Sequence, residues 1–452
     1  MPFIANSDAD RMAMLEAVGV KSIEELFADI PQAKRFPKLE LPEGLSELDV
    51  MREIESMAAK NVTASTCAWF LGAGAYNHFI PAAVGAIVSR GEFLTAYTPY
   101  QPEVSQGTLQ AIFEYQSMAA ELFGMEVVNA SHYDGATALA EAVLMAWNHG
   151  GERRKIALPA ALHPEYKGVI KTYFAAFDVE FAEYVGGPAN ASVDATTACV
   201  VAAYPDFEGE IQDIKAGAEK AHAAGALYVV HADPIMCALL KSPGELGADI
   251  VTAEGQALGN AMNYGGPWLG MMGATAKLMR KMPGRIVGQA QDAKGRRGFV
   301  LTLTAREQHI RREKAVSNIC SNQGLVMLQT CVYMALMGRN GMRKVAELCW
   351  NKAHYAASKI AGTKGFKVST RSFFKEFVVK TPVPAADIVE RLSRRCIVPG
   401  LAMSKYDAKR PDELLVCVTE MCTKAQIDLL VTSLSEAAGE KTNSRFGGEA
   451  VK

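Results

Sequence analysis

The sequence lacks a charge imbalance, a long apolar run and a leader of the secretory type. Its 47 Lys and Arg residues against 49 Asp and Glu residues give a net charge of −2, so no basic surface for nucleic acid is expected. No apolar run reaches the roughly 18 residues of a membrane-spanning helix. The start, MPFIANSDAD, is acidic and has no apolar stretch after basic residues, so no signal peptide is expected.

Paired cysteines and two glycine-rich fingerprints are also missing. The nine cysteines form no C-x-x-C pair, and the closest two are Cys417 and Cys422. We therefore expect no metal site and no disulfide framework, but reduced and mostly buried thiols in a cytoplasmic protein. G-x-G-x-x-G after a strand and G-x-x-x-x-G-K-[ST] are absent, which excludes the usual dinucleotide and P-loop sites.

What is present is a chain of 452 residues, 49% of them hydrophobic, which is enough to bury a large core. We predict a helical arm over 1–65, a large domain over 66–325 and a small α+β domain over 326–452. In the large domain, helices alternate with continuous apolar runs, which is typical of a mostly parallel sheet covered on both faces. The predicted strands are 155–163, 197–205, 226–234 and 247–255, and the predicted helices are 135–147, 165–177, 213–225 and, in the small domain, 341–362.

Three local features indicate chemistry at the ends of these elements. Gly135 and Thr137 open the helix 135–147, where first-turn N–H groups bind an anion; an ordinary N-cap by Asp134 explains the same pattern. Asp233 ends a buried strand, where it would pair with a protonated pyridine nitrogen, or cap the helix at Pro234. His163 ends another strand, where it would stack on an aromatic cofactor or serve the structure alone.

In this order, the three features describe the type I fold of pyridoxal phosphate enzymes, with a large sheet domain and a smaller C-terminal domain. Such an enzyme needs a lysine for its Schiff base, usually soon after the aspartate strand. Residues 242–276 contain no lysine, and neither Lys241 nor Lys277 is well placed. The scaffold therefore lacks its catalytic amine.

The chain resembles the alpha-type subunits of the P-protein family, the glycine decarboxylases of the glycine cleavage system. The most specific motif is FLTAYTPYQPEVSQGTLQ, and further matching motifs are FLGAGAYNHFIP, VTAEGQALGNAMNYGGPWLG and REQHIRREKAVSNICSNQ. These motifs span most of the chain.

The resemblance implies a split enzyme whose pyridoxal phosphate lysine lies on a second, beta-type subunit. Ala257, give or take a residue, stands where that lysine would be, so this chain is not expected to hold the cofactor covalently. His163 and Asp233 match the family's stacking and ring-nitrogen positions, either as working residues or as relics. The working site is expected at the interface, where this chain would lend Tyr97, Tyr100, Gln101 and Glu103 from YTPYQPE; a rigid interface loop is the structural alternative.

The implied reaction is decarboxylation of glycine, with release of CO₂ and transfer of the aminomethyl group to the lipoyl group of the H protein. The implied complex has two alpha and two beta chains. Arg306, Arg311 and Arg312 are available to bind the glycine carboxylate, but a solvated charged segment explains them equally well. Two other hypotheses stay open: a silent scaffold or regulatory subunit, and an independent pyridoxal phosphate enzyme with an unexpected lysine.

Overall fold

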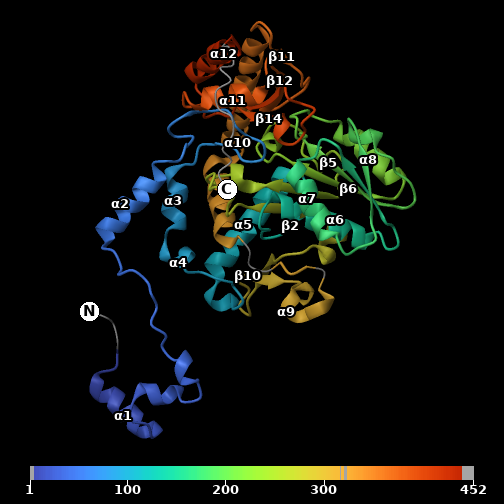
Figure 1. Cartoon of the computed structure of the whole chain (residues 1–452). Helices are drawn as coiled ribbons and strands as arrows, with labels where there is room; N and C mark the ends of the chain where they lie inside the picture. Colours follow the sequence, from blue (N-terminus) through green and yellow to red (C-terminus); the bar gives the residue numbers. More distant parts are fainter. Residues whose placement is uncertain (1–4, 316, 320–322, 440–452) are drawn as a thin grey trace. The chain divides into compact units, whose positions relative to one another are not determined.

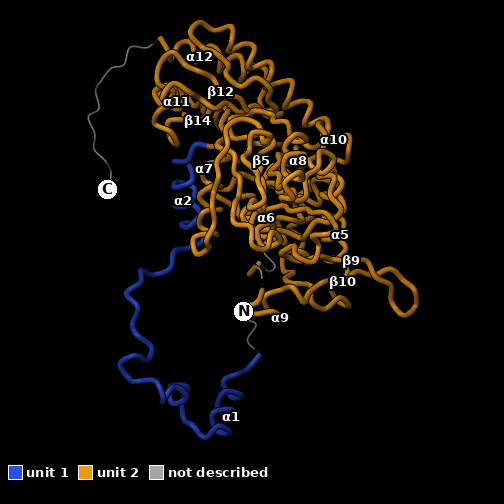
Figure 2. The backbone as a smooth tube through the Cα atoms, turned by 90° about the vertical axis from the view of Figure 1, so that its right-hand side faces the viewer, with its two compact units in different colours: residues 1–62 blue, residues 63–452 orange. Residues whose placement is uncertain are grey.

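The computed structural model describes residues 5–315, 317–319 and 323–439. They fall into two compact units, residues 1–62 and 63–452, which have different colours in Figure 2. The first unit contains α1 (Asp8–Val18), which begins at a capping box of Ser7 and Asp10, and α2 (Glu47–Ala58), which begins at Ser46. Neither helix buries a residue. The predicted boundaries at residues 65 and 325 stay predictions.

The second unit is built on a seven-stranded sheet with the strand order β2-β8-β7-β6-β5-β3-β4. Strands β3 to β7 are parallel, and β8 and β2 join antiparallel at one edge. Four of the parallel strands were predicted from their apolar runs, so the mostly parallel sheet is confirmed. The bounds are β2 (Val127–Val128), β3 (Lys155–Pro159), β4 (Glu180–Tyr184), β5 (Thr197–Tyr204), β6 (Leu227–Ala232), β7 (Ile250–Glu254) and β8 (Gly270–Ala274).

Helices cover both faces of this sheet (Figure 1). Val201 of β5 packs in the cluster that contains Leu139 of α6, whereas its neighbour Val200 packs in the cluster that contains Leu109 of α5. Because successive side chains point to opposite faces, an uninterrupted apolar strand needs this double cover. The helices are α3 (Ala82–Val88), α4 (Gly91–Leu94), α5 (Gln106–Phe123), α6 (Gly135–His149), α7 (Pro164–Tyr173), α8 (Ile214–Ala223) and α9 (Gln308–Arg311).

The C-terminal part carries a four-stranded antiparallel sheet with the order β11-β12-β15-β14. Helix α10 (Gly324–Ala361) leads into it and contains a non-helical residue, Gly338, at φ 57°. The sequence predicted only its second half, because the glycine interrupts the pattern. The other bounds are β1 (Ala68–Trp69), β9 (Ile286–Gln291), β10 (Arg297–Thr302), β11 (Lys367–Val368), β12 (Glu376–Lys380), α11 (Ala385–Ser393), β13 (Ile397–Val398), β14 (Leu401–Ala402), β15 (Glu413–Cys417) and α12 (Lys424–Gly439).

The expectation that all cysteines are free thiols is wrong for one pair. Cys67 and Cys396 form a disulfide with their Cα atoms 4.8 Å apart. They meet because β1 and β13 pair in parallel, with Ala68 opposite Ile397, a contact that no local spacing predicts. No helix in the described ranges is long and apolar enough to cross a membrane.

Candidate functional site

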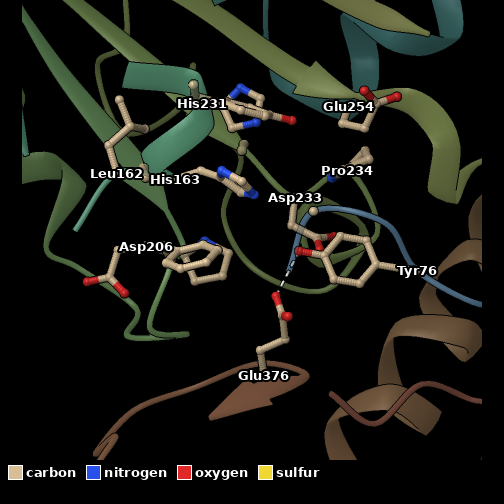
Figure 3. Close-up of a pocket in the computed structure, with 15 residues that line it drawn as sticks. Tyr76, Leu162, His163, Asp206, His231, Asp233, Pro234, Glu254 and Glu376 are labelled. Atoms are coloured by element: carbon tan, nitrogen blue, oxygen red, sulfur yellow. Dashed lines mark hydrogen bonds between the residues drawn. The ribbon is translucent and has the colours of Figure 1, made fainter. Parts of the chain in front are cut away.

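A small cavity of about 70 Å³ lies beyond the carboxyl ends of β5, β6 and β7. Figure 3 shows the side chains around it, which include His163 and Asp233 from the sequence prediction and Tyr76, Glu254 and Glu376 in addition. The cavity is far smaller than the roughly 300–1,000 Å³ of most ligand pockets. The predicted residues are thus brought to one place, but little free space lies between them.

Both carboxylate oxygens of Asp233 are used by the protein itself. Oδ1 accepts hydrogen bonds from the N–H groups of Ile235 and Met236 at 2.9 and 3.0 Å, so the aspartate caps the turn after β6. Oδ2 forms an ion pair with Lys375 Nζ at 2.7 Å. Asp233 thus caps the turn through one oxygen, and the oxygen that remains faces a lysine.

Lys375, which the sequence analysis did not single out, is the cation of this site. It precedes β12, and its side chain is only 1% exposed. Its Nζ lies 3.5 Å from the centre of the Tyr76 ring and 3.2 Å from His78 Nε2. Burial disfavours both charges of the pair, but their attraction outweighs it, so the pKa of Asp233 is lowered and the pKa of Lys375 is raised.

His163 is held by the protein on both sides of its ring. Its Nε2 lies 3.0 Å from the carbonyl oxygen of Ala73, and its Nδ1 accepts the N–H of Glu165 at 3.2 Å, which caps α7. The ring stacks on Tyr166 with centroids 4.8 Å apart and meets Phe207 edge-on at 4.6 Å. Burial lowers the pKa of His163. His163 was predicted to stack on a cofactor ring. In the structure, the rings that it contacts are those of Tyr166 and Phe207 of this chain.

The backbone N–H groups of Gly135 and Thr137 at the start of α6 also have hydrogen-bond acceptors within this chain. Asp134 Oδ1 accepts from Thr137 N at 2.8 Å and from Thr137 Oγ1 at 2.7 Å, a complete capping box. Gly135 N donates to Glu254 Oε2 at 2.8 Å. Two carboxylates therefore lie at the helix end where the sequence analysis weighed an anion site against an N-cap, and the N-cap interpretation is correct.

Glu254 is the last residue of β7 and is buried. Besides Gly135 N, it accepts the N–H groups of Gln256 at 2.9 Å and Leu269 at 3.2 Å, both through Oε1. Burial raises the pKa of Glu254 to about 8. The three backbone N–H donors lower this pKa because they stabilise the carboxylate, but the effect of burial is larger. The sequence analysis missed this residue because an acid at a strand end resembles a solvent-facing terminus.

Ala257 lies at the end of a short 3-10 turn directly after β7, and it is fully buried. Its neighbour Gln256 holds the loop that contains Tyr76. Gln256 Oε1 accepts from Tyr76 N at 2.8 Å, and Nε2 donates to the Tyr76 carbonyl at 2.9 Å. Alanine at this position offers no amine.

Glu376 follows Lys375 and holds the same loop from the opposite side. Its Oε2 accepts the Tyr76 hydroxyl at 2.7 Å (Figure 3). Its Oε1 accepts Ala73 N at 2.6 Å. A Cβ on Gly72 would lie 2.3 Å from Glu376 Oε1, so this close approach requires glycine. Burial raises the pKa of Glu376.

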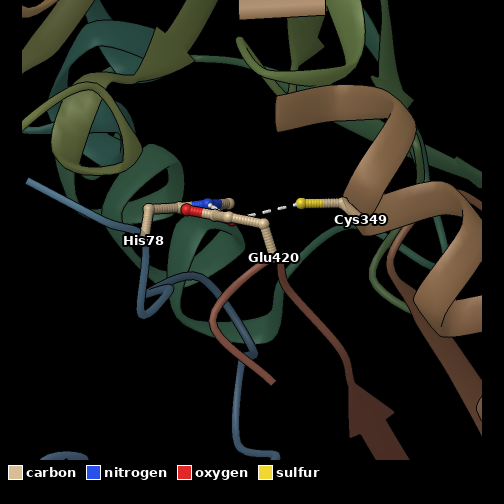
Figure 4. A group of neighbouring side chains, drawn as sticks. All are labelled: His78, Cys349 and Glu420. Carbon is tan, nitrogen blue, oxygen red and sulfur yellow. Dashed lines mark hydrogen bonds and ion pairs between the residues drawn. The ribbon is translucent and has the colours of Figure 1, made fainter. Parts of the chain in front are cut away.

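A buried hydrogen-bonded chain extends from Lys375 through His78 to Glu420 and Cys349. Figure 4 shows the last three of these residues. His78 Nδ1 lies 2.7 Å from Glu420 Oε2, and Cys349 Sγ donates to the same oxygen at 3.4 Å. Although the three residue types are ones that bind metals, His78 Nε2 faces the Lys375 ammonium, and Glu420 Oε1 accepts Phe79 N at 2.7 Å. The contacts describe a polar network in which His78 links Lys375 to Glu420.

The segment that holds Tyr97, Tyr100, Gln101 and Glu103 does not line this cavity. All four side chains are exposed, Tyr97 to 82% and Tyr100 to 54%. The Tyr100 hydroxyl accepts from Arg285 Nη2 at 3.0 Å, and the guanidinium lies over the ring. A second hollow, of about 240 Å³, is lined by Tyr97 and Arg285.

Arg285, which the sequence analysis also missed, is buried and pairs with Glu307 at 3.4 Å. Among the arginines named from the sequence, Arg306 donates to the carbonyl oxygens of Leu303 at 3.1 Å, of Gly284 at 3.0 Å and of Met282. Arg306 is thus engaged with the backbone, whereas Arg311 and Arg312 are exposed. None of these contacts assigns a carboxylate-binding role.

Comparison with known proteins identifies relatives along the whole chain. Residues 1–434 match the family described as glycine cleavage system P-protein. Two similar proteins are named probable glycine dehydrogenase (decarboxylating) subunit 1. The one from Thermomicrobium roseum is 48% identical over 447 residues, and the one from Chlorobium luteolum is 48% identical over 452; each alignment covers 97% of this chain and 100% of the relative.

Solved structures agree with these relatives. A crystal structure of glycine decarboxylase (P-protein) of the glycine cleavage system, in inhibitor-bound form, is 39% identical with a TM-score of 0.89, over 97% of this chain and 100% of that one. Sphingosine-1-phosphate lyase from Burkholderia pseudomallei is 17% identical with a TM-score of 0.63, over 90% of this chain and 94% of that one, and shows the fold alone. The predicted fold class, the type I fold of pyridoxal phosphate enzymes, is confirmed.

Proposed function

The chain belongs to the glycine cleavage system P-protein family, and from this membership we propose that it is subunit 1 of a glycine dehydrogenase (decarboxylating). The observation that carries the proposal is near-complete coverage: relatives of that name align over 97% of this chain and 100% of their own length. The activity is the decarboxylation of glycine, with release of CO₂ and transfer of the aminomethyl group to the lipoyl group of the H protein.

The cofactor belongs to a second subunit. Pyridoxal phosphate bound there supplies the electron sink that decarboxylation of an amino acid needs. The alanine at position 257 supports this assignment, because it leaves no amine at the end of β7. The only lysine that the described contacts bring to Asp233 is Lys375, and its ammonium is paired with that carboxylate. An independent pyridoxal phosphate enzyme is therefore not favoured.

This chain contributes the segment 97–103 across the subunit interface. The side chains of its four candidate residues are exposed. The segment itself is fixed, because Gln106 Nε2 donates to the carbonyl of Pro102 at 2.8 Å and to that of Phe299 at 2.9 Å. The Tyr100 hydroxyl is oriented by Arg285. Polar groups that are held in place before the reaction lower its barrier more than mobile ones.

The proposed assembly contains two copies of this chain and two of the second subunit, and its reaction partners are glycine and the lipoyl H protein. A cytoplasmic location is part of the same proposal. The name subunit 1 of the relatives implies a second subunit.

The proposal is tested on the complex of this chain with the second subunit, with lipoylated H protein and pyridoxal phosphate. Glycine labelled in its carboxyl group should release labelled CO₂, and carboxyl-labelled alanine should release far less. Borohydride reduction followed by peptide mapping should place a phosphopyridoxyl lysine on the second subunit. A stoichiometric label on Lys241, Lys277 or Lys375 of this chain would overturn the cofactor assignment, and no release from glycine would overturn the activity.

A further inference from the structure

We propose that Lys375 and Glu254 occupy, inside this chain, the two charged anchors by which this fold holds pyridoxal phosphate, and that they close the cleft to it. In this fold an acid pairs with the protonated ring nitrogen, and a helix N-terminus binds the phosphate. The two anchors here are Asp233 and the start of α6. The first carries a cation, as the protonated ring nitrogen would be, and the second carries a carboxyl group at the place of the phosphate.

The first anchor is occupied by a cation. Lys375 Nζ lies 2.7 Å from Asp233 Oδ2, at the only oxygen that the turn after β6 leaves available. The Tyr76 ring lies against the same ammonium at 3.5 Å. The lysine thus gives Asp233 the positive hydrogen-bonding partner that a protonated ring nitrogen would give.

The second anchor is occupied by a carboxyl group. Glu254 Oε2 accepts the first N–H of α6, from Gly135, while Oε1 accepts two further backbone N–H groups. Asp134 caps the same helix end with a second carboxylate. A phosphate dianion would meet two carboxyl groups there and no unused first-turn donor from Gly135 or Thr137. The packing is equally closed, because a Cβ on Gly135 would lie 2.9 Å from both Glu254 Cβ and Tyr166 Oη.

The space between the anchors is filled by the chain's own rings. His163 is stacked on Tyr166 and abuts Phe207, and Tyr76 is fixed by Glu376. The residues present therefore do not fit pyridoxal phosphate, and the remaining 70 Å³ cannot take a phosphorylated pyridine ring without movement of several of them. The inference concerns this chain's own residues, so it stands whether or not the complex decarboxylates glycine.

The cation half is tested by thermal unfolding of the full-length chain. Lys375→Met leaves the Asp233 carboxylate buried without its partner and should lower the midpoint by about 5 °C or more. Asp233→Asn should lower it similarly. The double variant, which has neither charge, should recover at least half of the loss. Lys424→Met is the matched control, because Lys424 pairs with Asp428 on the surface. The midpoint of this variant should stay within about 1 °C of that of the unaltered chain. Additive losses in the double variant would overturn this half.

The part of the proposal that concerns Glu254 is tested with Glu254→Gln, which keeps the shape but places an amide N–H₂ group among three N–H donors. The midpoint should fall by about 3 °C or more. An unchanged midpoint would contradict the role assigned to the carboxylate.

Closure of the cleft is tested on the unaltered chain with pyridoxamine 5′-phosphate, which carries both cofactor charges but forms no Schiff base with lysine. A ligand that binds the native state raises the midpoint in proportion to the logarithm of its concentration. No rise in the midpoint is expected up to millimolar concentration. A rise with the logarithm of concentration that Asp233→Asn abolishes would overturn the proposal.

Discussion

Tyr100 combines a fixed hydroxyl with an exposed ring. Arg285 donates to the hydroxyl at 3.0 Å, and Glu307 forms an ion pair with Arg285 at 3.4 Å. Tyr97 is 82% exposed, which is unusual for a large aromatic side chain in a monomer. Both features are those of residues prepared for a partner rather than for a core.

Removal of single polar groups from this segment should therefore reduce turnover and leave assembly unchanged. We expect at least one of Tyr97→Phe, Tyr100→Phe and Glu103→Gln to lower glycine-dependent exchange of labelled CO₂ by about tenfold or more, because a lost hydrogen bond to a transition state costs about 10²–10³ in turnover. Size-exclusion chromatography of each complex is the control for assembly. Three variants that assemble and exchange at the unaltered rate would assign the segment a structural role.

Glu420 gives the protein a specific acid sensitivity. Burial raises its pKa, but the His78 ring and the N–H of Phe79 stabilise the carboxylate more strongly, so its pKa falls to about 2 from a usual 4.5. A lowered folded-state pKa contributes stability above pH 4.5 that is lost as the pH falls towards 2. The full contribution is about 3 kcal/mol.

The free energy of unfolding should accordingly separate the unaltered chain from Glu420→Gln most strongly near pH 6. The difference should shrink by at least half between pH 5 and pH 3. Glu347→Gln, in an exposed pair with Arg343, should change little at any pH. A difference for Glu420→Gln that is independent of pH would show that its charge is not what stabilises the network.

At the scale of elements, helix α6 shows how tightly the closed cleft is packed. Gly135→Ala should destabilise the chain by about 1–3 kcal/mol, because the new methyl group would lie 2.9 Å from Glu254 Cβ and Tyr166 Oη. Gly168→Ala in α7 is the matched control, since nothing lies within 4 Å of its Cβ position. It should stabilise by about 0.5–1 kcal/mol through helix propensity. Urea unfolding measures the free energy of unfolding of both variants. Equal effects of the two substitutions would contradict the close packing around Gly135.

The elements that could be predicted are those whose pattern is local. The apolar runs of β5 and β6 and the cap of α6 by Asp134 are visible in a few consecutive residues. The glycine-rich strand β8 was missed, because GMMGA has neither β-branched residues nor alternation. The pairing of Cys67 with Cys396 depends on contacts across 329 residues and has no local signal.

In the candidate site, too, the residues with a local sequence signal were predicted and the residues without one were missed. His163, Gly135, Thr137 and Asp233 were located from their places at element ends, and the structure gathers His163 and Asp233 around one cavity. Lys375 and Glu254 were missed, because charges at strand ends usually face solvent. One signal was available: the charged pair Lys375 and Glu376 directly precedes the apolar, buried residues 377–379 of β12.

At the scale of the whole molecule, residues 1–62 carry many apolar side chains that the unit does not bury. In α2, Met51, Ile54 and Met57 recur at helical spacing, and each is more than half exposed. An apolar helix face of this kind favours burial against another surface. We predict that this surface belongs to the proposed complex of two copies of each subunit.

Light scattering of the two subunits, alone and mixed, checks this assembly. The mixture should give the mass of two chains of each kind, and deletion of residues 1–62 should weaken association at least about tenfold. Met51→Ser combined with Ile54→Ser is the milder variant, and Lys60→Ser is its control. Independent chains in the unaltered mixture would contradict the predicted assembly.

The central claim is that neither chain alone contains a complete site for glycine. Its most direct test is glycine-dependent exchange of labelled CO₂ by each purified subunit and by their mixture, with pyridoxal phosphate and lipoylated H protein in all three assays. We predict exchange in the mixture and at least about a hundredfold less in either subunit alone, in keeping with the loss of positioned groups from a site. Full exchange by the second subunit alone would reduce this chain to a scaffold, and exchange by this chain alone would contradict the account.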